Sequence, residues 1–200
     1  MVGIHSTINL PESYTDLDQT LNSADLILSD AVSNATSLFH TPVVSSINGK
    51  KVVSRVMVLR EFNLANKMMR FHTDHRAAKI KHFIENNNVS VIGYDPDLKI
   101  QIKLQGKIRV HYDDEVTESA WRESNGRSKK CYSIKDGSTK EILEPSDYDI
   151  QDFEVEDGYE NFAVLIFNFN SLEFLYLKSS GHRRAIHRWG NDLKSTWLVP

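Results

Sequence analysis

The pattern of hydrophobic and polar residues divides the chain into a helical start and a long β-rich remainder. Hydrophobic residues recur at spacings of three, four and seven within residues 14–39, which predicts an amphipathic helix. After residue 39, short runs rich in β-branched and aromatic residues alternate with turn residues, as is typical of strands. The expected inward face of the helix is Leu17, Leu21, Leu28, Val32 and Ala35.

The β-rich part contains one strong turn signal and one informative glycine. Asn48-Gly49 separates two runs of strand residues, and this pair favours a type I′ hairpin turn, in which both central residues have positive φ. Gly106 lies inside a long run, where a glycine often marks a bulge or a close approach. The predicted strands cover residues 43–47, 52–59, 67–73, 89–94, 100–112, 162–169, 172–178, 185–188 and 197–199.

Two short helices interrupt this series, at residues 74–86 and 113–124. The many short strands and few long helices predict a mainly β fold with flanking helices, arranged as a closed or nearly closed antiparallel barrel. No repeat or linker divides the chain, so residues 1–200 are expected to form one domain. The first short helix would bury Ala77, Ile80, Phe83 and Ile84.

Composition narrows the class of protein. A hydrophobic fraction of 40% and a charged fraction of 26% are ordinary for a globular protein, and the net charge of −3 argues against nucleic-acid binding. The single cysteine, Cys131, excludes an internal disulfide and favours a reducing compartment. The N-terminal residues lack a signal-peptide pattern and no apolar run has membrane-spanning length, so we expect a soluble cytoplasmic protein.

Charge is distributed unevenly along the chain. Residues 141–160 contain nine acidic residues and no Lys or Arg, whereas residues 178–194 contain five basic residues and one acidic residue. Such a distribution permits a local anion site on a protein that is acidic overall.

The first candidate anion site is the segment 73–79, where a predicted strand gives way to a predicted helix. Arg76 and Lys79 are three residues apart and would share one face of the first helical turn. Cations oppose the helix dipole there unless an anion, most simply phosphate, also binds to the free N–H groups. The alternative is a solvated face with Asp74 capping the helix, and the segment alone leaves both open.

The second candidate is Arg55, which strand alternation places on one face with Met57 and Leu59. A guanidinium on an apolar face needs a partner, either a bound phosphate or a carboxylate from residues 141–160. Gln101 begins a long strand, and its amide can pair with the edge of a heterocycle, although it can equally be an ordinary exposed residue.

The third basic segment is residues 183–188, which contains Arg184 and Arg188 and can also be a solvated edge strand blunted by charge. Other chemistries find no support. The histidines have no metal-site spacing with carboxylates or thiolates, and no nucleophile elbow, P-loop or dinucleotide fingerprint is present.

Taken in order, these segments resemble the pyridoxamine 5′-phosphate oxidase family of FMN-binding split barrels, over about residues 24–200. The resemblance rests on the motifs RVMVLR from Arg55, FHTDHRA from Phe71, IQIKLQGK from Ile100, RAIHR from Arg184 and the final WLVP. It implies a split β-barrel and FMN as the cofactor. It also implies a homodimer with the flavin at the subunit interface and a small-molecule substrate.

The resemblance also assigns roles to individual residues. It implies that Arg55 holds the FMN phosphate, that the strand after it contacts the flavin ring through its backbone, and that Gln101 binds the ring edge. Arg188 would reach the flavin across the dimer interface. The expected cofactor-binding residues are Arg55, Val56, Met57, Val58, Arg60, His72, Thr73, Arg76, Lys79, Gln101 and Arg188. The expected substrate-binding residues are Ser128 and Arg184.

The chain departs from the family on the substrate side. Ala120 and Ser124 stand where the family has a Tyr and an Arg that hold the pyridoxal phosphate group, and only Ser128 of that set remains. Each lost charge-assisted contact costs roughly 1.5–3 kcal/mol of substrate-binding free energy.

We therefore expect an FMN-dependent oxidoreductase of uncertain substrate. The alternatives are an authentic pyridoxamine 5′-phosphate oxidase, a non-catalytic flavin- or haem-binding protein, and a structural domain whose basic strand pairs with residues 141–160.

Overall fold

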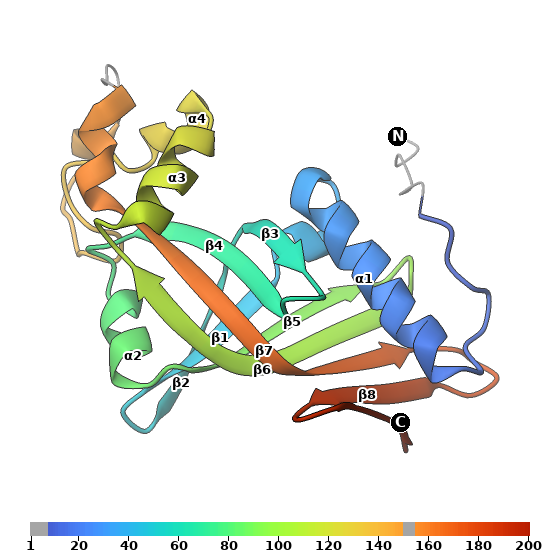
Figure 1. Ribbon diagram of the computed structural model, residues 1–200. Helices are drawn as coiled ribbons and strands as arrows, with labels where there is room; N and C mark the ends of the chain where they lie inside the picture. The colour runs from blue at the N-terminus through green and yellow to red at the C-terminus, as the bar shows by residue number, and fades with distance from the viewer. Residues whose placement is uncertain (1–7, 150–154) are drawn as a thin grey trace.

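A computed structural model describes residues 8–149 and 155–200 of the chain. The helical elements are α1 (Leu17–Ser33), η1 (Leu38–His40), α2 (Lys79–Glu85), α3 (Glu115–Glu123), α4 (Gly126–Lys130), η2 (Pro145–Tyr148) and η3 (Val155–Asn161). The strands are β1 (Val43–Asn48), β2 (Lys51–Val56), β3 (Leu59–Asn63), β4 (Met68–Asp74), β5 (Asn88–Asp95), β6 (Ile100–His111), β7 (Phe162–Tyr176), β8 (Arg183–Trp189) and β9 (Leu193–Leu198). The expected mainly β fold with flanking helices is confirmed (Figure 1).

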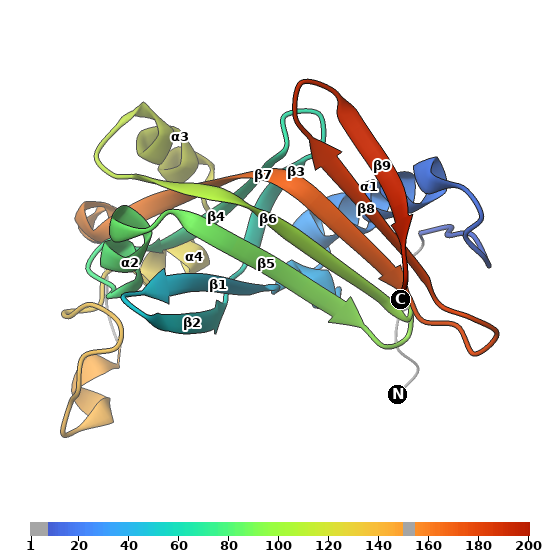
Figure 2. The same cartoon turned by 90° about the horizontal axis from the view of Figure 1, so that it is seen from below.

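The strands of the described residues form one antiparallel sheet in the order β2-β1-β5-β6-β7-β4-β3. Strand β7 is its centre. β6 pairs along one side of it, while β4 pairs with its first half and β8 with its second half on the other side. β9 extends the branch by pairing with β8. Helices α2, α3 and α4 gather at one end of the sheet and α1 lies toward the other (Figures 1 and 2).

The bulge expected at Gly106 is confirmed. The register between β6 and β7 shifts between Gln105 and Gly106. A Cβ atom at position 106 would overlap the Asn168 carbonyl oxygen, so only glycine lets the two backbones approach this closely. The bulge bends two of the longest strands of the sheet, because a bulge increases local twist and curvature.

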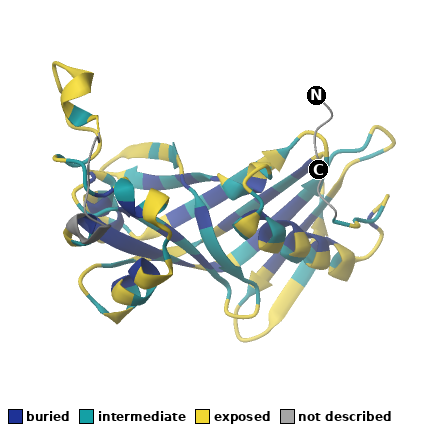
Figure 3. Ribbon diagram, turned by 90° about the horizontal axis from the view of Figure 1, so that it is seen from above, coloured by how far each residue is buried: buried dark blue, intermediate teal, exposed yellow. Residues whose placement is uncertain are grey.

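Buried side chains concentrate along the central strands (Figure 3). The expected inward face of α1 is confirmed for Leu28, which is buried, and for Leu21 and Val32, which are partly buried and pack against the core. It is wrong for Leu17, which lies outside that cluster, and for Ala35, which lies beyond the helix end. Small residues let the helix approach the sheet closely on the face that actually packs. The buried residues of α1 are Thr20, Ser23, Ala24, Ile27, Leu28 and Ala31.

Three local expectations also need correction. Asn48 pairs with Lys51, so the hairpin loop is Gly49-Lys50, and only Gly49 has positive φ, at 59°. That is the type II′ pattern, with glycine first, rather than type I′. The strand expected over 52–59 breaks after Val56, and β3 starts at Leu59. The strands expected at 162–169 and 172–178 are one strand, β7.

Helix α2 begins at Lys79 and not at residue 74. The Asp74 carboxylate accepts a hydrogen bond from the backbone N–H of Arg76 at 2.7 Å, which forms a local turn that competes with the helix. Ala77, Ile80 and Phe83 are buried as expected, whereas Ile84 is 69% exposed.

Candidate functional site

A cavity of about 400 Å³ lies where α2 and α4 meet the break between β2 and β3. Its size falls within the range of small-molecule sites, roughly 300–1,000 Å³. We call it the strand-break cavity. It is lined by Val56, Met57, Val58, Arg60, His72, Thr73, Lys79, Arg127, Ser128, Cys131 and Tyr132.

The wall made by residues 56–58 follows from the strand break. Met57 points into the core, at 7% exposure, and its backbone N–H donates to the Pro42 carbonyl at 3.1 Å. Val58 lies between the two strands and belongs to neither ladder. The break therefore presents peptide groups to the cavity that a continuous strand would hold within its ladder.

Arg55 directly precedes the lining residue Val56 and lies on the less exposed face of β2, as expected from alternation, while Met57 and Leu59 are buried beyond the end of that strand. Its Nη1 donates to the Val44 carbonyl at 3.1 Å and to the Ser46 hydroxyl at 2.9 Å. No carboxylate of the described residues pairs with it, so the expected alternative of a partner from residues 141–160 finds no support there. Burial lowers the pKa of the Arg55 guanidinium.

Lys79 converges with Arg55 on one face of α2. The Arg55 guanidinium carbon lies 5.4 Å from the centre of the Phe83 ring, and Lys79 is one helical turn before Phe83. The Lys79 ammonium donates to the Thr73 hydroxyl at 3.1 Å. Burial first, and then the charge of Arg55, lower the pKa of Lys79, with a smaller opposing effect from Asp74. Two half-buried cations that destabilise each other form a site that an anion would stabilise.

His72 contributes a neutral imidazole to the same cavity. Burial lowers its pKa to about 3, assisted by the charges of Arg70 and Arg60. Its Nε2 is buried without a hydrogen-bond partner in the described residues, and its ring packs edge-on against Phe162. An orphaned ring nitrogen at a cavity wall is a group that a ligand can satisfy.

Arg76 is directed away from the cavity. Its guanidinium makes an ion pair with Asp74 at 2.7 Å and donates to the carbonyls of Ile134 and Lys135 at 2.8 and 3.1 Å. It therefore fastens the segment after α4 to the end of β4. The expectation that Arg76 and Lys79 share a first helical turn is wrong, because α2 starts only at Lys79, and Asp74 does not cap it.

Gln101, Arg184 and Arg188 lie far from the cavity within one chain. Gln101 pairs with Leu175 on β7, whereas the cavity residue Thr73 pairs with Ala163 on the same strand. Ala163 and Leu175 are twelve residues apart on β7, which corresponds to roughly 40 Å of strand at about 3.3 Å per residue. Arg184 is held by Glu173, whose carboxylate accepts from its Nε at 2.9 Å, and Arg188 lies opposite Lys194.

Three lining residues were missed from the sequence. Arg127, Cys131 and Tyr132 belong to or follow α4, a five-residue helix too short to show hydrophobic periodicity. The one feature of the sequence that could have indicated this helix is its N-cap residue, Asn125, whose Oδ1 accepts a hydrogen bond from the Ser128 N–H at 2.8 Å.

Other parts of the described structure lack comparable chemistry. A cavity of about 450 Å³ between the β1–β2 hairpin and β5–β6 has Lys107 as the only cation among its lining residues. The described residues contain no group of three or more His, Cys, Asp or Glu side chains that could hold a metal ion. Within the same part of the chain, no helix is long and apolar enough to cross a membrane.

The site fits a phosphate-bearing cofactor by its own chemistry. Unpaired cations lie at one side, peptide groups outside the strand ladders line another, and an orphaned imidazole nitrogen lies between them. These are the features that a nucleotide with a phosphate group and a polar heterocycle can satisfy.

Residues 25–112 match the family model of the pyridoxamine 5′-phosphate oxidase FMN-binding domain. No curated protein sequence matches the chain significantly.

Solved structures share the fold. A pyridoxamine 5′-phosphate oxidase-related, FMN-binding protein from Nostoc punctiforme superposes with a TM-score of 0.73 at 16% identity, covering 90% of this chain and 96% of its own. PhzG from Burkholderia lata, in complex with tetrahydrophenazine-1-carboxylic acid, superposes with a TM-score of 0.67 at 16% identity. The match covers 92% of this chain and 90% of the PhzG chain. At these identities the likeness establishes the fold alone, a split barrel. The family model over residues 25–112 and this shared fold both support a relation to the pyridoxamine 5′-phosphate oxidase-like family.

Proposed function

We propose that the chain binds FMN in the strand-break cavity and works as an FMN-dependent oxidoreductase. One observation carries the proposal: Lys79 at this cavity and the nearby Arg55 lie close to each other without a carboxylate partner among the described residues. The cofactor would supply two-electron transfer between a reduced donor and an acceptor, while the protein would bind and orient it. The matching family model is that of an FMN-binding domain.

The chain's own residues would bind and orient the cofactor. Arg55 and Lys79 would hold its phosphate, Thr73 would fix the Lys79 ammonium, and the peptide groups of residues 56–58 would meet the ring edge. His72 is neutral at physiological pH because its pKa is about 3, so it would accept or donate a hydrogen bond without adding charge. Arg76 would act indirectly, by fastening the segment that carries Arg127 to Tyr132.

A homodimer would complete the site. Gln101, Arg184 and Arg188 cannot reach the strand-break cavity of their own chain, because their partners on β7, Leu175 and Ser171, lie eight to twelve residues along the strand from Ala163, the partner of Thr73. They could meet the flavin only from a second copy, which agrees with the sequence expectation of a cofactor at a subunit interface. The solution mass of the protein, with and without FMN, tests this part of the proposal.

The purified protein tests the function directly. We expect an absorption spectrum with flavin bands, and bleaching of the visible band when a reduced nicotinamide is added without oxygen. A flavin that binds but is not reduced by any donor would support a carrier rather than an enzyme. A colourless protein that takes up no FMN would refute the proposal.

A further inference from the structure

A second cavity of about 200 Å³ adjoins the strand-break cavity and shares Arg60, His72 and Ser128 with it. We call it the arginine cavity. Its volume corresponds to roughly six or seven waters at about 30 Å³ each, the size of a small organic acid. Its remaining lining residues are Arg70, Ala120, Glu123, Ser124 and Asn125.

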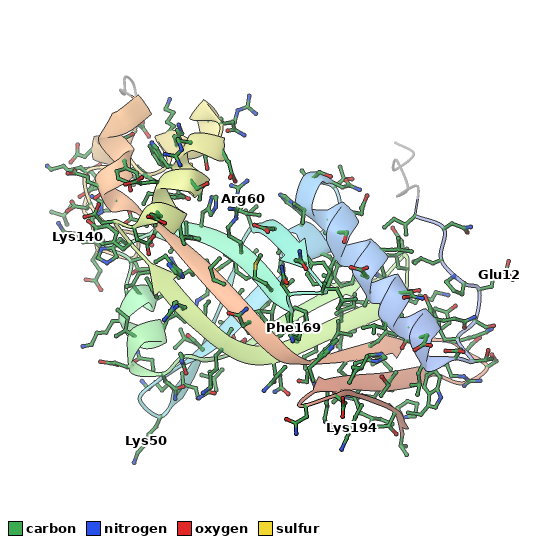
Figure 4. The ribbon with its side chains drawn as sticks, in the orientation of Figure 1. Glu12, Lys50, Arg60, Lys140, Phe169 and Lys194 are labelled. Carbon is green, nitrogen blue, oxygen red and sulfur yellow. The ribbon has the colours of Figure 1, made fainter. Side chains whose placement is uncertain are left out.

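Arg60 is the available cation of this cavity. It extends from β3 and lies next to α3 and β4 (Figure 4). Its Nε is buried without a hydrogen-bond partner, and no carboxylate of the described residues forms an ion pair with it. A half-buried guanidinium in this state lacks the compensation that buried charges normally have, and an anionic ligand would provide it.

Arg70, by contrast, already has two carboxylate partners, Glu61 and Glu123. Glu123 Oε2 accepts a hydrogen bond from its Nη2 at 3.1 Å. Glu61 Oε2 lies 3.2 Å from its Nε, a purely electrostatic contact because that Nε makes no hydrogen bond. Glu123 itself lines the arginine cavity, so a negative charge is built into the wall. His72 adds no positive charge at neutral pH, since its pKa is about 3.

The other polar groups of the cavity are neutral. Asn125 Oδ1 accepts from the Ser128 backbone N–H at 2.8 Å, which leaves the Asn125 NH₂ group as a donor. Ser124 donates its hydroxyl to the Ala120 carbonyl at 2.8 Å and can still accept. The cavity therefore offers one uncompensated guanidinium, neutral donors and one carboxylate.

We propose that the arginine cavity binds the carboxylate of a small monoanionic substrate, next to the flavin, and discriminates against a phosphate dianion. One unpaired guanidinium balances one negative charge, whereas the second charge of a dianion would face Glu123 without compensation. The assignment of this anion site to a substrate rests on the proposed function, because a substrate must lie beside the cofactor. Its binding test is independent of flavin chemistry.

The test compares benzoate with phenyl phosphate by isothermal titration calorimetry, in the protein as purified and after FMN saturation. The two probes share one ring and differ in anionic group. We expect benzoate to bind at least about tenfold more tightly, since one charge-assisted contact contributes roughly that factor or more. In the FMN-saturated protein, where FMN already fills the phosphate site at Arg55 and Lys79, equal affinity or tighter binding of phenyl phosphate would overturn the proposal.

Three variants locate the binding. Arg60→Gln should weaken benzoate binding about tenfold or more, and Arg60→Lys should recover part of the loss. Glu123→Gln should raise the affinity for phenyl phosphate more than that for benzoate, because the repelling charge that it removes acts more strongly on a dianion. Arg122→Gln is the matched control on the same helix, since its side chain is 72% exposed and pairs only weakly, 3.9 Å from Glu118. It should change neither affinity.

The outcomes separate this proposal from the proposed function. Benzoate binding that depends on Arg60 in a protein unable to take up FMN would support the anion site and refute the flavin function. FMN uptake with benzoate binding unaffected by Arg60→Gln would refute the anion site alone.

Discussion

Replacing Lys79 with methionine tests whether this residue binds a ligand or stabilises the fold. The Lys79 ammonium has one hydrogen bond in the described structure, to Thr73, and its pKa is lowered by burial and then by Arg55. If it holds the FMN phosphate, its loss removes a charge-assisted contact of roughly 1.5–3 kcal/mol. The dissociation constant of FMN should then rise by roughly 10- to 150-fold.

The stability of the FMN-free protein should respond differently. Lys79→Met loses one hydrogen bond, about 1 kcal/mol. The same change removes the burial cost of an ammonium and its repulsion from Arg55, which offset that loss. The free energy of unfolding should therefore stay within about 1 kcal/mol of the parent or rise, as is common when a binding residue is removed.

Two assays and one control complete the experiment. FMN fluorescence quenching measures the dissociation constant, and circular dichroism measures the melting temperature without FMN. Lys81→Met is the matched control, because the Lys81 side chain on the same helix is 77% exposed and faces Glu85 at 3.7 Å. A melting temperature lowered by more than about 4 °C with unchanged FMN affinity would refute the reasoning and make Lys79 a structural residue.

Three further predictions follow from other parts of the structure. Gly106→Ala should lower the free energy of unfolding by about 2–3 kcal/mol in urea denaturation, because its Cβ would overlap a backbone carbonyl of β7; an unchanged midpoint would contradict the bulge. Arg76→Ala should weaken FMN binding far less than Lys79→Met but speed proteolysis of the segment after α4, which Arg76 fastens; the reverse order would contradict the assignment. Burial lowers the pKa of His187 and of His72, so the unfolded chain binds more protons below about pH 6.5. Stability should fall as pH drops below that value, and His187→Gln should flatten the fall.

The sequence predicted those features that depend on strand alternation and on single special residues. Arg55 lies on the less exposed face of β2 as alternation requires, and Gly106 marks the bulge. Residues 56–58, Thr73 and Lys79 line the same cavity, whereas their expected role in binding the cofactor stays a prediction. The alternation follows from a period of two, and the bulge follows from a residue type with one physical role.

The remaining features depend on competition between local interactions that a pattern does not reveal. The carboxylate of Asp74 holds the Arg76 N–H in a turn, which delays α2 to Lys79 and directs the Arg76 guanidinium to carbonyls far along the chain. Helix α1 packs through Ala24 and Ala31 and not through its leucine spacing alone, because small residues allow close approach.

The arginine cavity shows the same limit of sequence reasoning. Ala120 and Ser124 could be recognised as a loss of family contacts, but the pairing of Arg70 with Glu123 spans 53 residues and required the fold. The net charge of a site depends on which charged side chains lie close together in the fold. The sequence shows which residues are charged but not which of them are neighbours.

The affinity of FMN relative to riboflavin tests the central claim most directly, because the two ligands differ only in the phosphate. If Arg55 and Lys79 hold that phosphate, FMN should bind roughly 100-fold or more tightly than riboflavin, from two charge-assisted contacts. The ratio should fall toward one in the Arg55→Ala, Lys79→Met double variant. Equal affinities in the unmodified protein would contradict the claim that these two cations form a phosphate site.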